Sequence, residues 1–318
     1  MNGNIEAPVT FDHLKKAISH GILAFPATAF KSDDALDRDA NAAHARFLSE
    51  HAPAALVCGG GAGEIFSLDL GEQRALVEVT VAACGGIPVI AGVGQGAAYA
   101  KEAARDAEEA GAAAVLLFPP YLVHAEQQGL RDYIADVCRA TALPVIAYSR
   151  DNGIVSPDTA LALADAHDNF LGIKDGVGDF ESMLDLKLRS GDRMVLINGV
   201  PTAEILAVQC FAFGIESYSS AVFTFLPEVA KRFFYAVASG DVIESSRLLH
   251  EFYLPLIALR RRRRGYAVSI IKAGLRLTGQ SAGPVRPPLT DLTSEEMGEL
   301  ERLIALATKD GVAHAVSH

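Results

Sequence analysis

The chain has 318 residues, of which 50% are hydrophobic and 21% are charged, and its net charge is −11 at neutral pH. This length and apolar content allow one large buried core, so a single domain of barrel size fits better than two. The negative charge argues against a nucleic-acid partner, because proteins that bind a phosphate backbone concentrate basic charge.

The spacing of the cysteines and histidines and the lengths of the apolar runs argue against disulfide-linked, metal-binding and membrane-spanning proteins. The cysteines are widely spaced and unpaired in sequence, which is typical of reduced, buried thiols; they are Cys58, Cys84, Cys138 and Cys210. The histidines contain no HxH or HExxH pattern, so we expect no metal and no other cofactor. The longest apolar run, 112–123, is too short to span a bilayer, and residues 1–21 lack the apolar centre of a secretion signal. We expect a cytoplasmic protein with no membrane partner.

Eight short runs rich in Val, Ile, Leu and Ala recur along the chain. They are 22–24, 55–58, 89–93, 114–118, 145–148, 171–174, 195–198 and 215–218. Their hydrophobicity is continuous rather than alternating, which is typical of parallel strands covered on both faces. Segments with helical spacing lie between them, for example 71–83, 97–110, 127–140, 156–167 and 201–212.

This alternation predicts an α/β fold, a (β/α)₈ TIM barrel. An open doubly wound sheet is the competitor, but residues 25–30 after the first run lack the glycine-rich turn that binds a dinucleotide. We place the barrel in residues 1–225 and expect helices in 226–318 to pack on it as a C-terminal helical extension of the same structural unit. Thr293 and Glu296 form a capping box that predicts the start of the last helix, and Gly265 is expected to end an earlier one.

Lys174 lies at the end of the sixth apolar run and is directly followed by Asp175 and Gly176. Burial disfavours the charged form of a lysine and lowers its pKa, which makes the amine a nucleophile toward a carbonyl. The alternative is that Lys174 extends to solvent or pairs with Asp175.

Tyr148 ends the fifth run, 26 positions earlier, and Arg150 follows it. A phenol beside the lysine can carry the protons of imine formation, and a guanidinium can bind a carboxylate with two hydrogen bonds. The alternatives are a core tyrosine with its hydroxyl at the rim, and an arginine that only pairs with Asp151.

Other polar or glycine-rich strand ends should meet at the same barrel mouth. The glycine-rich segment 59–64 offers backbone N–H groups to an anion unless it is only a flexible turn. Small hydrogen-bonding groups follow the seventh and eighth runs at Asn198, Gly199, Ser217 and Ser219. The five arginines of 260–264 are interpreted as solvated residues near a helix end, with no catalytic role.

The motifs GGGAGE (59–64), PVIAY (144–148) and LGIKDG (171–176) resemble the dihydrodipicolinate synthase/N-acetylneuraminate lyase superfamily over essentially the whole barrel. Within it, several stretches are similar to 5-dehydro-4-deoxyglucarate dehydratases: FPPYL (118–122), AYSRDNG (147–153), NGVPTAE (198–204), ESYSSAVF (216–223), GYAVSIIKAG (265–274) and GPVRPPLTDL (283–292). Gly61 and Ala62 replace the threonines of the synthases and lyases, and Leu122 replaces the synthases' second tyrosine. This chain therefore cannot assemble the threonine–tyrosine relay of the synthases from these positions.

The resemblance implies a hydro-lyase that converts 5-dehydro-4-deoxy-D-glucarate to 2,5-dioxopentanoate, carbon dioxide and water through a Schiff base on Lys174, with Tyr148 moving protons. It also implies that the backbone of Gly60, Gly61 and Ala62, with Thr28, holds the carboxylate next to the imine. The residues expected to face the hydroxylated remote end of this keto-deoxy sugar diacid are Arg150, Asn198, Gly199, Ser217 and Ser219. A homotetramer or homodimer is implied as well. The alternatives are a pyruvate-dependent aldolase or synthase of the same superfamily and a non-catalytic barrel that binds sugar acids.

Overall fold

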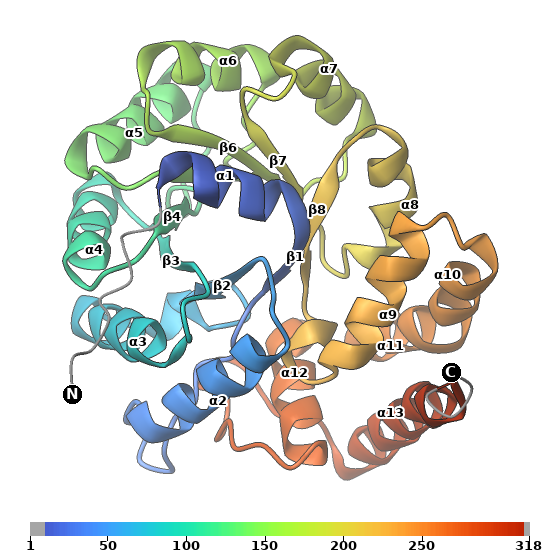
Figure 1. The fold of residues 1–318 in the computed structure, drawn as a ribbon. Helices are drawn as coiled ribbons and strands as arrows, with labels where there is room; N and C mark the ends of the chain where they lie inside the picture. The colour runs from blue at the N-terminus through green and yellow to red at the C-terminus, as the bar shows by residue number, and fades with distance from the viewer. Residues whose placement is uncertain (1–9, 315–318) are drawn as a thin grey trace, which may run out of the picture.

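The computed structural model describes residues 10–314, which form a closed barrel of eight parallel strands surrounded by helices (Figure 1). Strand β8 pairs with β1, so the sheet has no free edge. The strands are β1 (His20–Ala24), β2 (Ala55–Cys58), β3 (Val89–Val93), β4 (Ala114–Leu117), β5 (Val145–Ser149), β6 (Phe170–Asp175), β7 (Val195–Asn198) and β8 (Glu216–Ser220). The predicted barrel is confirmed, and each apolar run overlaps the strand that it predicts.

A helix follows each strand and covers the outside of the barrel. These helices are α2 (Arg38–Glu50), α3 (Leu70–Ala83), α4 (Ala97–Glu109), α5 (Gln127–Ala140), α6 (Pro157–Ala166), α7 (Phe180–Ser190), α8 (Glu204–Ala212) and α9 (Pro227–Ala238). Their starts follow local chemistry: Asp69 and Glu72 form a capping box at α3, and the hydroxyl of Ser156 caps α6 directly before Pro157.

Alternate residues of each strand face the barrel interior and the surrounding helices. The interior is filled with apolar side chains such as Leu116 and Val195. Helix α1 (Phe11–Ser19) crosses the strands in Figure 1 and adds Leu14 and Ile18 to this cluster. The amino-terminal end of the barrel is therefore closed by side chains, and polar groups gather at the opposite mouth.

The C-terminal part continues as helices that share the large apolar cluster between strands and outer helices. After α9 come α10 (Val242–Leu248), the π-helix η3 (Leu249–Tyr253), α11 (Leu254–Arg260), α12 (Tyr266–Leu277) and α13 (Ser294–His314). The buried rings of Phe252, Tyr253 and Tyr266 belong to the same cluster as the barrel residue Tyr218. Among residues 10–314, no helix combines the length and the apolar character needed to cross a membrane.

The two helix signals predicted in this part have different outcomes. The capping box is confirmed, because Thr293 Oγ1 accepts the backbone N–H of Glu296 and Glu296 Oε2 accepts that of Thr293. The prediction that Gly265 ends a helix is wrong. Helix α11 already ends at Arg260, and Gly265, at a φ of +88°, directly precedes α12. Glycine is favoured there because a left-handed residue lets the chain turn back into a helix.

Candidate active site

Lys174 is buried at the carboxyl end of β6, with 3% of its surface exposed. Its Nζ lies 3.5 Å from the centre of the Tyr148 ring and donates a hydrogen bond of 3.1 Å to the carbonyl oxygen of Gly199. The carboxylate of Asp175 instead accepts backbone N–H groups, at 2.7 Å from Gly178. Desolvation lowers the pKa of Lys174, although the nearby Tyr148 hydroxyl opposes part of this shift. The side chain therefore neither reaches solvent nor forms an ion pair with Asp175.

The backbone around β6 brings Lys174 to this position. Tyr148 and Lys174 are directly paired in the register of β5 and β6, so both side chains lie in the same layer at the mouth. A Cβ on Gly172 would lie 2.0 Å from the carbonyl oxygen of Val195, and one on Gly199 would lie 2.5 Å from Lys174 Nζ. Glycine at these two positions allows β6 and β7 to approach closely and leaves room for the amine.

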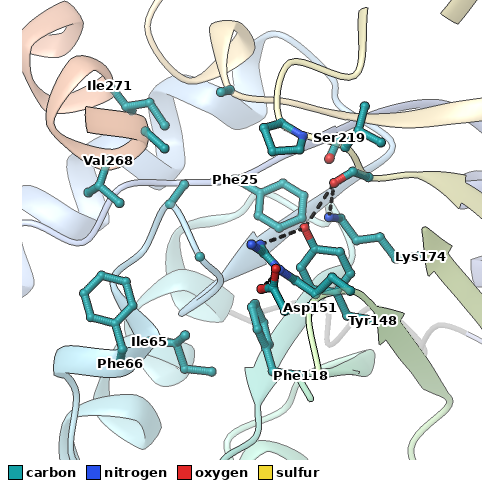
Figure 2. A pocket seen from close by; sticks show the side chains of 18 of the residues that line it. Phe25, Ile65, Phe66, Phe118, Tyr148, Asp151, Lys174, Ser219, Val268 and Ile271 are labelled. Atoms are coloured by element: carbon teal, nitrogen blue, oxygen red, sulfur yellow. Dashed lines mark hydrogen bonds and ion pairs between the residues drawn. The ribbon is translucent and has the colours of Figure 1, made fainter. Parts of the chain in front are cut away.

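Tyr148 lies beside Lys174 (Figure 2) and also contacts Arg150. Its hydroxyl donates a hydrogen bond of 3.0 Å to the carbonyl oxygen of Gly199, and Arg150 Nη1 donates one of 3.2 Å to the hydroxyl. Burial alone would raise the pKa of Tyr148, but the charges and hydrogen bonds of Lys174 and Arg150 outweigh it, so the pKa is lowered. A phenol with a lowered pKa next to a lysine with a lowered pKa is suited to proton exchange.

These side chains line a cavity of about 550 Å³ at the mouth of the barrel. Its walls near Lys174 are aromatic, formed by Phe25 and Phe118 (Figure 2), and Tyr121 and Leu122 lie at its exposed rim. Within residues 10–314, no three His, Cys, Asp or Glu side chains come together in a group that could hold a metal ion.

Most of the predicted binding residues line this cavity, and the others lie behind them. The lining includes Gly61, Ala62, Arg150, Gly199 and Ser219. Gly60 packs under the Phe25 ring, since a Cβ there would lie 2.9 Å from it. Ser217 is fully buried, and its hydroxyl has no hydrogen-bond partner among the described residues.

Thr28 and Asn198 support the backbone of the cavity and do not line it. The hydroxyl of Thr28 donates a hydrogen bond of 2.6 Å to the carbonyl oxygen of Gly63, and Asn198 Nδ2 donates one of 2.9 Å to that of Ala203. Their direct contact with substrate stays a prediction.

Several polar residues of the lining were not predicted as site residues, among them Thr202, Glu204 and Arg260. Arg260 corrects the interpretation of the arginine run. Residues 261–264 are exposed as expected, but Arg260 is the last residue of α11 and its Nη1 hydrogen-bonds to Thr202 Oγ1. Glu204 is fully buried, which raises its pKa to about 7, and its Oε1 accepts a hydrogen bond of 2.5 Å from Ser220. The motif that contains Thr202 and Glu204 was noted in the sequence, without a role for either side chain.

The glycine-rich segment is anchored by the C-terminal extension. Glu64, at the end of this segment, is fully buried at a φ of +55° and forms an ion pair of 2.6 Å with Lys272 of α12. Lys272 is also fully buried, and its Nζ donates a hydrogen bond of 2.6 Å to the carbonyl oxygen of Pro284. The backbone N–H of Arg286 donates to Glu64 Oε2 at 3.0 Å. The position of the segment at the cavity thus depends on residues more than 200 positions away in sequence.

Comparisons with known proteins identify the family and the fold. Residues 18–307 match the dihydrodipicolinate synthetase family. A curated relative from Rhizobium rhizogenes, named "Probable 5-dehydro-4-deoxyglucarate dehydratase", is 46% identical over 92% of this chain and 97% of its own length. A relative of the same name from Bradyrhizobium diazoefficiens is also 46% identical, over 93% of this chain and 95% of its own length. A solved dihydrodipicolinate synthase from Oceanobacillus iheyensis has the same fold, with a TM-score of 0.85 at 23% identity over 94% of this chain and all of that chain.

Proposed function

The chain belongs to the dihydrodipicolinate synthetase family, and we propose that it is a 5-dehydro-4-deoxy-D-glucarate dehydratase (decarboxylating) that works through a Schiff base on Lys174. The observation that carries this proposal is the buried Lys174 amine, which faces Tyr148 inside a cavity and forms no ion pair with a carboxylate of the described residues. The names of the relatives supply the substrate. The proposal includes a cytoplasmic homodimer or homotetramer, as the family resemblance implies.

In the first stage of the proposed mechanism, the neutral Lys174 amine attacks the ketone beside the first carboxylate, and loss of water gives an iminium. The iminium acidifies the neighbouring methylene, and removal of a proton from it gives an enamine. The enamine electron pair then expels the hydroxyl group one carbon further on, which takes up a proton and leaves as water. In this proposal Tyr148 carries these protons, a role supported by the hydrogen bonds that its hydroxyl and Lys174 Nζ both donate to the Gly199 carbonyl oxygen.

The second stage releases carbon dioxide. Elimination leaves an iminium conjugated with a carbon–carbon double bond, and the remote carboxyl group sits one carbon beyond that double bond. When its carbon–carbon bond breaks, the electron pair passes through the double bond to the iminium nitrogen and gives a dienamine that ends in an enol. Two carbons then take up protons while the enol loses one, and hydrolysis returns Lys174 and releases 2,5-dioxopentanoate. The balance is one water and one carbon dioxide lost.

Two features of the cavity support a carboxylated substrate. The backbone N–H groups of Gly61 and Ala62 have no hydrogen-bond acceptor among residues 10–314, and both residues line the cavity. Such paired N–H groups bind an anion without a charged side chain. The Ser219 hydroxyl group faces the same cavity and suits a hydroxylated carbon chain (Figure 2).

Borohydride trapping tests the proposal directly. Reduction in the presence of the substrate or pyruvate should leave a covalent adduct on the peptide that contains Lys174, as identified by mass spectrometry. Both Lys174→Ala and Lys174→Arg should abolish turnover, because arginine keeps the charge but forms no Schiff base. Lys231→Arg, on the outer helix α9, is the matched control and should retain activity.

Three kinds of result would contradict the proposed function or the role of Lys174. An adduct on another lysine, or turnover in Lys174→Arg, would remove the catalytic role of Lys174. Release of pyruvate from the substrate, without carbon dioxide, would assign the aldolase alternative. A protein that binds sugar acids but gives no adduct and no product would be the non-catalytic barrel.

A further inference from the structure

Three cations line the described cavity: Lys174, Arg150 and Arg260. Arg150 already has partners, because its Nε lies 2.6 Å from Asp151 Oδ2 and its Nη1 donates to the Tyr148 hydroxyl. Its charge is therefore balanced at the Lys174 end of the cavity before any substrate binds.

Arg260 has no such balance. Its guanidinium hydrogen-bonds to the neutral hydroxyl of Thr202 and forms no ion pair with a carboxylate in the part of the chain that the structure describes. Two other arginines of the run differ, since Arg262 pairs with Glu299 at 2.8 Å and Arg263 lies 4.0 Å from Glu296. A partly buried guanidinium without a counterion is costly unless an anion binds beside it.

The surroundings of Arg260 also favour an anionic ligand. Desolvation lowers its pKa, and the charge of Arg261 acts in the same direction, so a bound anion would relieve both effects. The acidic group whose charge acts on Arg260 is Glu204, and burial raises the pKa of that carboxyl to about 7, so it is only partly ionised at neutral pH. Thr202 has a backbone φ of +58°, a left-handed conformation that a β-branched residue rarely adopts.

We propose that Arg260, together with the Thr202 hydroxyl, binds the carboxylate at the end of the substrate remote from the imine. This inference rests on the proposed function, which requires a keto diacid. A guanidinium can hold a carboxylate through two parallel hydrogen bonds, which fixes the orientation of the group as well as its charge. Arg150, which the sequence analysis expected at this end, then acts on the Tyr148 hydroxyl.

The contact should affect substrate binding more than the chemical step. The remote carboxyl group keeps its charge through imine formation and dehydration, so the contact with Arg260 stabilises the bound substrate and the transition states of these steps alike. Substitution of Arg260 should therefore raise KM and leave kcat little changed.

A matched pair of 2-keto acids isolates this subsite. 2-Oxoadipate has the six-carbon skeleton of the substrate without its hydroxyl groups, and 2-oxohexanoate lacks only the remote carboxylate. The probe is the concentration of each acid that gives half-maximal borohydride trapping. We expect the wild type to favour 2-oxoadipate by about 10-fold or more, as a charge-assisted contact predicts. This preference should disappear in Arg260→Gln and persist in the matched control Arg264→Gln, whose side chain is exposed.

The outcomes separate this subsite from the Schiff-base chemistry. If Arg260→Gln and the wild type need the same concentration of 2-oxohexanoate for half-maximal trapping, the variant is folded and Lys174 still reacts. An unchanged preference for 2-oxoadipate in Arg260→Gln would overturn the subsite, and its loss in Arg150→Gln alone would assign the remote carboxylate to Arg150. Absence of any adduct in the wild type would overturn the proposed function and the subsite together.

Discussion

The buried ion pair between Lys272 and Glu64 should couple the stability of the fold to the shape of the active site. Both side chains are fully buried and lie 2.6 Å apart, so Lys272→Met would leave a buried carboxylate without its counterion. Removal of one partner of a buried pair costs about 3–5 kcal/mol. The double variant Glu64→Gln/Lys272→Met leaves no buried charge at this site and should recover much of that loss. The free energy of unfolding, measured with urea, gives both values.

The same variants report on the glycine-rich segment. Glu64 ends that segment, and Gly61 and Ala62 lie a few residues before it at the cavity wall. We expect Lys272→Met to raise the KM for the substrate even at temperatures where it is fully folded, and the double variant to have a smaller effect. The single variant Glu64→Gln completes the comparison. A loss of stability in the double variant that equals the sum of the losses in Lys272→Met and Glu64→Gln would refute the coupling, as would a cost below about 1 kcal/mol for Lys272→Met.

Two further predictions concern buried groups that can gain or lose a proton, Tyr148 and Glu204. Tyr148→Phe keeps the ring against Lys174 but removes the hydroxyl, so kcat should fall about 10²- to 10⁴-fold in steady-state assays, whereas the exposed control Tyr235→Phe should match the wild type. Burial raises the pKa of Glu204 from 4.5 to about 7, so the carboxyl group binds a proton more tightly in the folded state than in the unfolded chain. The stability that this proton contributes is present below about pH 4.5 and is lost as the pH rises through 7. The stability of Glu204→Gln relative to the wild type should therefore increase by about 3 kcal/mol between pH 4.5 and about pH 8, and an unchanged difference in urea unfolding would contradict the burial argument.

The barrel and the position of Lys174 at its mouth were predictable because they depend on local patterns. Continuous apolar runs marked the strands that are covered on both faces, and Lys174 stood out as one charge at the end of such a run. Parallel strands place their carboxyl ends together, which was enough to expect Tyr148 beside Lys174 before their register was known.

The rest of the site depends on contacts that local patterns do not encode. Five consecutive arginines cannot be told apart in the sequence. Arg260 lies at the cavity because it is the last residue of α11, whereas residues 261–264 follow the helix and are exposed. Thr28 was correctly placed after the first strand, but the direction of its hydroxyl, toward the Gly63 carbonyl oxygen, is set by a segment 35 residues away. Lys272 gave no sequence signal, because its partner Glu64 comes from the other end of the chain.

Among residues 10–314, the closed amino-terminal end of the barrel leaves the mouth as the passage for the proposed reaction. Leu14 and Ile18 of α1 seal that end against a densely packed interior, so nothing the size of the substrate can pass through the strands. In the proposed reaction, substrate entry and the departure of water, carbon dioxide and the dioxo acid would then share the mouth that Tyr121 and Leu122 border. Each turnover has to empty this passage before the next can begin, which makes the exposed rim, far from the reacting carbons, a place where the rate of the whole cycle can be set.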